Sequence, residues 1–436
     1  MIYLIKPVSE MRAFVLLLSC FLPVLAFAQN WNPRNENRIL DADVASVKLS
    51  LNGSPLSLPM LQINAPNGAM VLEFDHLGDE TQEYQYTILH CDSHWQPSDL
   101  QDNEYINGYT DDRILDFNSS FNTRAPYTHY VVRLPNANMR WTKSGNYLLR
   151  IFEENDERTP VLERRFCVAE PAWRVEAEFV RPAQVSKQET HHEIDFRINY
   201  KDSRISNPMT EVQTVIMQNG RWDNAIGPLR PYATRNNELV YDYQDKIVFP
   251  AGREFRYFDI STFNNRSDRV RSILVNKNDQ YEVTLETDRS RATSAVSFRS
   301  DLNGQFSIEN QNPNQSLLQA DYAWVLFSIL QNAPLDGEDV YLFGEFTDWQ
   351  PKPAFKMTYN EEAHAYWGEA FLKQGFYNYA YQVVSQATSV PDETGLEGND
   401  YRASNQYTIL AYFRPYGTRY DRLMAAASFN STDWNK

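Results

Sequence analysis

Cysteine is scarce in this sequence, with three in 436 residues, so the chain is not held together by a disulfide framework. Positive charge is also in deficit, because 41 Lys and Arg stand against 57 Asp and Glu, which gives a formal net charge of −16 at pH 7. Such a surface repels phosphate backbones and argues against nucleic acid as a partner. Beyond the N-terminal region, no apolar run is long enough to cross a bilayer as a helix.

Aromatic residues are abundant instead, at 14% with 26 Tyr and 24 Phe. Flat rings pack well on the half-buried face of a strand, so this enrichment favours β-structure. Apolar content of 42% and charged content of 22% are typical of a folded globular protein. The length suggests about three domains.

The first residues read as a secretory signal peptide. Arg12 is followed by an apolar run that ends in Ala26-Phe27-Ala28, a small-x-small cleavage site. We therefore expect residues 1–28 to be removed and the mature chain to be exported to the periplasm. Glu10 is unusual before such a run, which leaves Met11 as an alternative start to Met1.

Cys20 offers a rival interpretation as the lipidated cysteine of a lipoprotein. Leu18, two positions before it, fits that signal poorly, and much of the apolar run would then follow the modified residue. Cleavage after Ala28 is the interpretation we carry forward.

Period-two alternation recurs along the mature chain and helical periodicity is scarce. The segment EIDFRINY (193–200) places Ile194, Phe196 and Ile198 on one face, and FYNYAYQVV (376–384) repeats the pattern. Short strands separated by Pro, Gly, Asn and Asp turns predict an all-β chain of tandem antiparallel Ig-like β-sandwich domains.

Two breaks in composition predict the domain boundaries. A strand-like segment ends before Pro171 and a new one begins after it, and a second strand ends in the polar segment LETDRSRATSAV (285–296). We expect a first β-sandwich at 29–170, a second at 171–289 and a third Ig-like β-domain at 290–436.

The segment LHCDSHWQPSDL (89–100) resembles a chemical site because it holds two histidines, a cysteine and an aspartate within the five positions 90–94. Alternation puts His90 and Cys91 on opposite faces of a strand, where one metal ion could not easily take both, and no second Cys/His cluster completes a zinc site. Nothing supplies an evident oxyanion hole for a Cys91–His94 nucleophile pair. We therefore predict the end of a strand and a turn under which Trp95 packs, and no catalytic residues, metal or cofactor.

Two cysteines, Cys91 and Cys167, remain in the mature chain. An export compartment permits a disulfide between them, but two buried thiols are the interpretation that we favour.

The segment 339–384, which contains LFGEFTDWQ, resembles the early-strand Ig-like modules of glycogen-binding and branching-enzyme proteins. Under that resemblance Trp349 and Trp367 would be exposed platforms for sugar rings. The interpretation that we favour is that both tryptophans are core or turn-packing residues, since a fold carries no function with it. A periplasmic or secreted glycan-binding protein is therefore the alternative function.

Six motifs spread in order over the mature chain resemble the plug protein family of the bacterial type IX secretion system. They are HCDSHWQPSDL, NGYTDDRILDFNSSFNTRAPYTHYVVRLPN, QNGRWDNA, FPAGREFRYFDIS, LFGEFTDWQ and EGNDYRASNQYTILAYFRPYGTRYDRL.

The resemblance implies a non-catalytic periplasmic protein on the inner face of the outer membrane, without a transmembrane segment of its own. It would bind the periplasmic opening of the large outer-membrane translocon barrel and close its channel until release. The charged, Tyr-rich segment from Tyr105 to Tyr127 is the candidate contact, through Tyr105, Tyr109, Phe117 and Tyr127.

Overall fold

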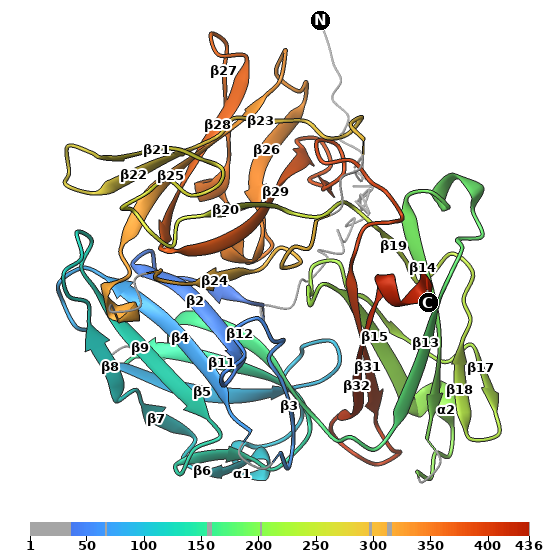
Figure 1. The fold of residues 1–436 in the computed structure, drawn as a ribbon. Coiled ribbons are helices and arrows are strands. Elements are labelled where there is room, and N and C mark those ends of the chain that lie inside the picture. Colours follow the sequence, from blue (N-terminus) through green and yellow to red (C-terminus); the bar gives the residue numbers. More distant parts are fainter. Residues whose placement is uncertain are drawn as a thin grey trace, which may run out of the picture. The chain divides into compact units, whose positions relative to one another are not determined.

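The computed structural model describes residues 36–65, 68–154, 159–200, 203–295, 299–311 and 316–435. The expected signal peptide, with Met11 and Cys20, lies outside these residues. Residues Asn35–Lys436 form one compact unit. Its elements are almost all strands, arranged in antiparallel sheets (Figure 1). Within the described residues, no helix is both long and apolar enough to span a membrane.

The first sandwich packs a six-stranded sheet on a four-stranded sheet. The larger sheet runs, in spatial order, β1 (Arg38–Ile39), β12 (Pro160–Ala169), β11 (Gly145–Glu153), β5 (Tyr84–Cys91) and β7 (Asp111–Arg113), with β3 (Met60–Gln62) beside β12. The smaller sheet runs β2 (Val44–Leu51), β4 (Met70–Leu77), β9 (Tyr127–Leu134) and β8 (Asp116–Ser119). The helix α1 (Asp102–Tyr105) leads into the pair β6 (Ile106–Gly108) and β10 (Met139–Trp141).

The second sandwich is built from two segments of the chain that are far apart in sequence. One sheet runs β13 (Arg174–Val180), β14 (His191–Asn199), β18 (Glu238–Tyr241) and β17 (Ala233–Arg235), with β19 (Val248–Pro250) also on β14. The other runs β16 (Ile226–Leu229), β15 (Val212–Gln218), β31 (Gln406–Phe413) and β32 (Arg422–Asn430). The helix α2 (Pro208–Glu211) precedes β15.

The third sandwich holds the remaining strands. One sheet contains β20 (Arg256–Asp259), β29 (Gly375–Ser385) and β24 (Phe306–Ile308), with β26 (Glu338–Phe343) and β30 (Pro391–Asp392) also on β29. The other runs β21 (Val270–Val275), β22 (Tyr281–Leu285), β25 (Tyr322–Leu330), β28 (Ala365–Lys373) and β27 (Thr358–Asn360), with β23 (Asp288–Arg289) on β25. Single 3-10 turns occur at η1 (Val185–Lys187), η2 (Leu317–Gln319), η3 (Glu345–Thr347), η4 (Pro353–Phe355) and η5 (Ser431–Asn435).

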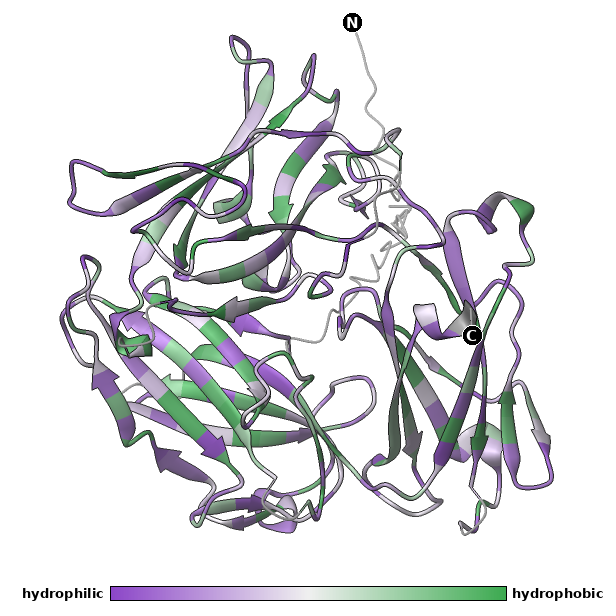
Figure 2. Cartoon of the chain, viewed as in Figure 1, coloured by the Kyte–Doolittle hydropathy of each residue, from purple (hydrophilic) through white to green (hydrophobic). Residues whose placement is uncertain are grey.

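The expected alternation is confirmed in the cores. Ile194, Phe196 and Ile198 of β14 are buried in the second core, and Tyr377 and Tyr379 of β29 are buried in the third. Figure 2 shows the same division, with apolar residues along the strands and hydrophilic residues at most turns. The period-two spacing of the apolar residues therefore predicts the all-β sandwich fold.

The strand pairing does not place a change of sandwich at the expected boundary between residues 289 and 290. The chain leaves the second sandwich after β19, which ends at Pro250, and enters the third at β20. It then returns, because β31 pairs with β15 from Val212↔Phe413 to Gln218↔Tyr407. The change from the first to the second sandwich does fall at the Pro171 break, between β12 and β13. Local alternation reveals a strand but not a partner about two hundred residues away, which explains the difference.

Candidate functional site

The strand β5 ends in the His-Cys segment and separates its two reactive side chains. His90 lies opposite Tyr147 in the first core and its Nε2 donates to the Ser144 carbonyl oxygen at 3.0 Å. Cys91 points to the other side of the sheet, into a separate apolar cluster. Burial lowers the pKa of His90 to about 4 and raises the pKa of Cys91 to about 12. A neutral imidazole and a protonated thiol on opposite faces cannot form a nucleophile pair.

Cys91 and Cys167 are both buried thiols, which resolves the alternatives left open by the sequence. Both lie opposite Asn146, Cys91 from β5 and Cys167 from β12, so β11 runs between them. Two strand spacings amount to about 10 Å, beyond the roughly 7 Å that a disulfide spans between Cα atoms. In the described part of the chain, no group of three His, Cys, Asp or Glu residues could hold a metal ion.

Cys91 and Cys167 belong to a buried cluster that joins the first sandwich to the second. We call this cluster the apolar seam; its members are Cys91, Trp95, Leu148, Cys167, Ala169, Val215, Met217, Leu410, Tyr412 and Leu423. Trp95 packs edge-on against Trp222 of the second sandwich at 4.8 Å between ring centroids. The guanidinium carbon of Arg165 lies 4.5 Å from the Trp95 centroid. The predicted packing role of Trp95 is therefore confirmed, and its packing partner comes from another sandwich.

A buried ion pair joins the first sandwich to the third. Lys373 Nζ on β28 lies 2.6 Å from Asp75 Oδ2 on β4, and both side chains are at most 3% exposed. Asp75 also accepts the hydroxyl of Tyr322 at 2.7 Å and binds His129 Nδ1 at 2.7 Å. Burial opposes a charge on Asp75, but the ammonium of Lys373 and the imidazole of His129 hold its pKa below the ordinary value. We call these residues, with Tyr127, the Asp75 clamp.

Tyr127, a predicted partner contact, is a member of this clamp. Its side chain is 1% exposed and its hydroxyl donates to the Ala320 carbonyl oxygen at 2.9 Å. Lys373 Nζ lies 3.9 Å from the centroid of its ring. Tyr127 therefore binds the third sandwich of its own chain, and its ring does not face solvent.

Trp349, a predicted sugar platform, packs where the third sandwich meets Arg221 of the second. The Arg221 guanidinium carbon lies 4.9 Å from the Trp349 centroid, and the ring contacts Phe343 and Phe255 edge-on. Arg221 is 2% exposed and donates to Glu393 at 2.6 Å. Trp367 lies elsewhere, on β28, and is 44% exposed. Arg221 thus covers one face of the Trp349 ring, and the residue is partly buried.

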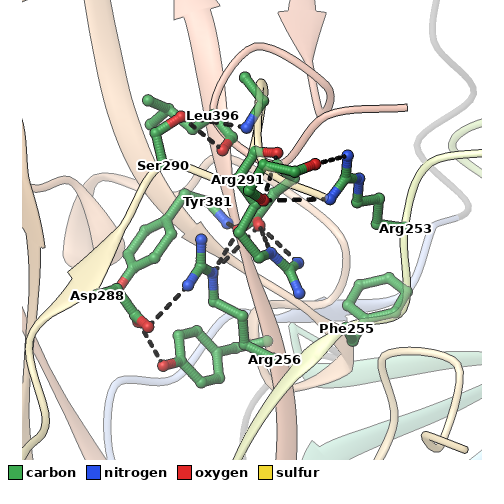
Figure 3. A network of polar contacts seen from close by, with 12 residues as sticks. Arg253, Phe255, Arg256, Asp288, Ser290, Arg291, Tyr381 and Leu396 are labelled. Carbon is green, nitrogen blue, oxygen red and sulfur yellow. Dashed lines mark hydrogen bonds and ion pairs between the residues drawn. The ribbon is translucent and has the colours of Figure 1, made fainter. Parts of the chain in front are cut away.

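Buried charges also fasten the two segments that cross between the second and third sandwiches (Figure 3). Arg256, on the outgoing segment, donates from Nε to Glu397 on the returning segment at 2.9 Å and from Nη1 to Asp288 at 2.7 Å. Arg291 Nε donates to Glu397 at 2.8 Å, and the Tyr381 hydroxyl donates to Asp288 at 2.8 Å.

The donors around Glu397 account for its protonation state. Burial disfavours its charge, yet the guanidinium groups of Arg256 and Arg291 hold the pKa of Glu397 below the ordinary value. Each carboxylate is occupied by donors of the same chain, so this network holds the crossing segments and leaves neither carboxylate placed as a general acid or base.

The segment from 105 to 127 is where exposed apolar side chains gather. Tyr109 is 65% exposed and Phe117 40% exposed, whereas Tyr105 is 1% exposed and donates its hydroxyl to Asp102 at 2.6 Å. The structure adds Leu115, 79% exposed, and Phe121, 47% exposed. The odd-numbered alternation L-x-F-x-S-x-F from 115 to 121 is the sequence signal that could have identified them.

The comparisons with known proteins agree with these features. Residues 44–170 match the family model of the type 9 secretion system plug protein 1st domain. A crystal structure of a hypothetical protein from Parabacteroides merdae ATCC 43184 is similar over 91% of this chain and 99% of that chain, with 30% sequence identity and a TM-score of 0.86. No curated protein matches the sequence.

Proposed function

This chain belongs to the type 9 secretion system plug protein family, and on that premise we propose that it closes the periplasmic opening of the outer-membrane translocon barrel. Family membership associates it with type 9 secretion and with the cell envelope. In the proposed role the chain is periplasmic and non-catalytic, is peripheral to the outer membrane, and leaves the barrel when cargo is to pass.

The observation that carries the proposal is the way its sandwiches are joined. The apolar seam and the Asp75 clamp connect sandwiches through buried side chains, and the Arg256–Glu397 pair fastens the two segments that cross between the second and third sandwiches. Separating the sandwiches would expose the apolar seam to water and break the hydrogen bonds that satisfy these side chains. A barrel wide enough for folded cargo would also pass small solutes, and only a body that does not flex open would stop them.

The first test is retrieval from the native envelope. The mature chain carries a C-terminal tag, is purified gently from detergent-solubilised envelopes of its own host, and its companions are identified by mass spectrometry. We expect one very large outer-membrane barrel in stoichiometric amount. Recovery of the chain as a lone soluble protein would remove the proposal.

The second test addresses closure. The barrel is purified with and without this chain and inserted in planar bilayers. We expect a large, steady conductance from the barrel alone and little conductance when the chain is bound, with the open conductance restored after the chain is washed away. Equal conductance in both preparations would mean that the chain binds without closing the channel.

A further inference from the structure

The strand β8 leaves one edge of the first sandwich open. It is the last strand of its sheet, beside β9, and in the described part of the chain no strand pairs with its other side. All of its residues, from Asp116 to Ser119, are exposed, and it lies at the margin of the first sandwich in Figure 1. An open edge is a template for an additional strand.

The register shows which backbone groups of β8 face this edge. The Ser120 N–H donates to the Tyr127 carbonyl oxygen, so residues of even number bond to β9. Hydrogen-bonded and non-bonded positions alternate along an antiparallel pair, so Phe117 and Ser119 direct their N–H and C=O groups outward. Phe121 is also odd-numbered, and its N–H donates to the carbonyl oxygen of Leu318 in η2. The open part of the edge therefore ends before Phe121.

The side chains at this edge form an apolar row. Phe117 and Ser119 project to the same side of β8 because successive residues of a strand alternate. Leu115 and Phe121 flank the strand, and the three apolar residues are 40% to 79% exposed. Phe117 also contacts Tyr130 of the core at 5.6 Å between centroids, so the row is anchored on the sandwich. We call these four residues the edge row.

The segment that leads into the edge row is rich in acidic residues, of which Glu104 is paired with Arg419. Residues 99–121 contain six Asp and Glu against a single arginine, a net charge of −5. That arginine, Arg113, is itself paired with Glu154, while Arg133 pairs with Asp116. An occupant with basic side chains on either side of apolar ones would complement this charge.

We infer that the edge row docks an extended, basic segment of a partner protein, which adds to the sheet as a further strand beside β8. Backbone bonds to Phe117 and Ser119 would supply affinity, and the apolar row with the acidic segment that leads into it would supply specificity. The inference rests on the proposed function, because the partner is then the translocon barrel.

The test compares variants on two open edges of the same chain. Leu115→Asp places a charge in the row, and Ser119→Pro removes an outward N–H while sparing the ladder to β9. The matched controls are Leu274→Asp and Val275→Pro on β21, the open edge of another sheet. Leu274 is 59% exposed and Val275 is 47% exposed. The Asn276 N–H bonds to Gln280, so Val275 also directs its N–H outward.

The probe is the translocon barrel purified from a host that lacks this chain, with binding followed by biolayer interferometry. We expect at least tenfold weaker binding for Leu115→Asp and for Ser119→Pro, wild-type binding for both controls, and weaker binding of the wild type as NaCl rises from 0.05 to 0.5 M. Hydrogen exchange provides a readout independent of substitution, because the amides of Phe117 and Ser119 should become protected in the complex.

The other outcomes distinguish failure of the proposed function from failure of the docking inference. If the wild type does not bind the barrel, the proposed function falls and the docking inference falls with it. If the wild type binds and both edge variants bind equally well, only the docking inference falls. A homodimer that Ser119→Pro abolishes would identify a second copy of this chain as the occupant and overturn the partner assignment. Thermal unfolding of each variant confirms its fold, and should Ser119→Pro not fold, Leu115→Asp and hydrogen exchange decide.

Discussion

The Asp75 clamp predicts that replacing His129 with glutamine removes a specific pH dependence of stability. His129 is 22% exposed and binds the buried Asp75 at 2.7 Å, with Glu73 at 3.8 Å from its other ring nitrogen. Lys373 is the nearby cation that opposes its charge. Burial alone would favour the neutral imidazole, but the carboxylates of Asp75 and Glu73 prevail and raise the pKa of His129 to about 9.

The magnitude and its direction follow from linkage. A pKa that rises from 6.5 in the unfolded chain to about 9 in the fold corresponds to about 3 kcal/mol. Because the folded pKa is the higher one, this stabilisation is fully present below pH 6.5 and is lost as the pH rises to about 9. Asp75 does not contribute to the pH dependence in this range, because its lowered pKa means that it titrates only at acidic pH.

Urea unfolding of the mature chain, followed by tryptophan fluorescence and circular dichroism at pH 6, 7.5 and 9.5, measures the effect. His129→Gln should cost about 3 kcal/mol at pH 6 and almost nothing at pH 9.5, where the wild-type imidazole is neutral. The control is His94→Gln, because His94 is exposed and outside the clamp. Parallel pH profiles for wild type and His129→Gln would refute the assignment of charge to His129.

Three further outcomes follow from the junctions. Trp349→Ala should lower the free energy of unfolding by about 3–5 kcal/mol, measured by urea unfolding. Neither the wild type nor this variant should be retained on a polysaccharide column. Cys91 and Cys167 should react with a thiol reagent only after denaturation, and reductant should not move the unfolding midpoint; a mass consistent with a disulfide would contradict the strand geometry. Arg256→Met should cost about 3–5 kcal/mol by uncovering buried carboxylates, and should broaden or split the unfolding transition; an unchanged sharp transition would show that the crossing segments need no such pair.

The sequence was sufficient for properties that depend on a single strand. Alternation placed Phe196 and Tyr379 in cores and set His90 and Cys91 on opposite faces, because both follow from the period of extended backbone.

The sequence was insufficient where a strand face is covered by a different sandwich. Tyr127 and Trp349 were expected at a surface, yet each is packed by contacts with a different sandwich. Tyr105 was expected there too, and it lies in the core of its own sandwich. Tyr127 and Trp349 illustrate the reason: an aromatic ring at the end of a strand looks the same in sequence whether solvent, a ligand or another sandwich lies beyond it. Only Leu115 and Phe121 carried a usable alternating signal, and it was hidden in a segment rich in charge.

The distribution of strong and weak contacts suits a removable closure. The sandwiches are joined by the apolar seam and by buried, mutually satisfied groups such as Asp75 with Lys373, so separating them would expose apolar surface to water and break these hydrogen bonds. The edge row, by contrast, is half exposed, preceded by an acidic segment and anchored by the single ring contact of Phe117 with Tyr130. Strand addition there would form few backbone bonds and would be screened by salt. A protein whose sandwiches are hard to separate, and whose docking contact is easier to break, would leave its partner as one folded unit.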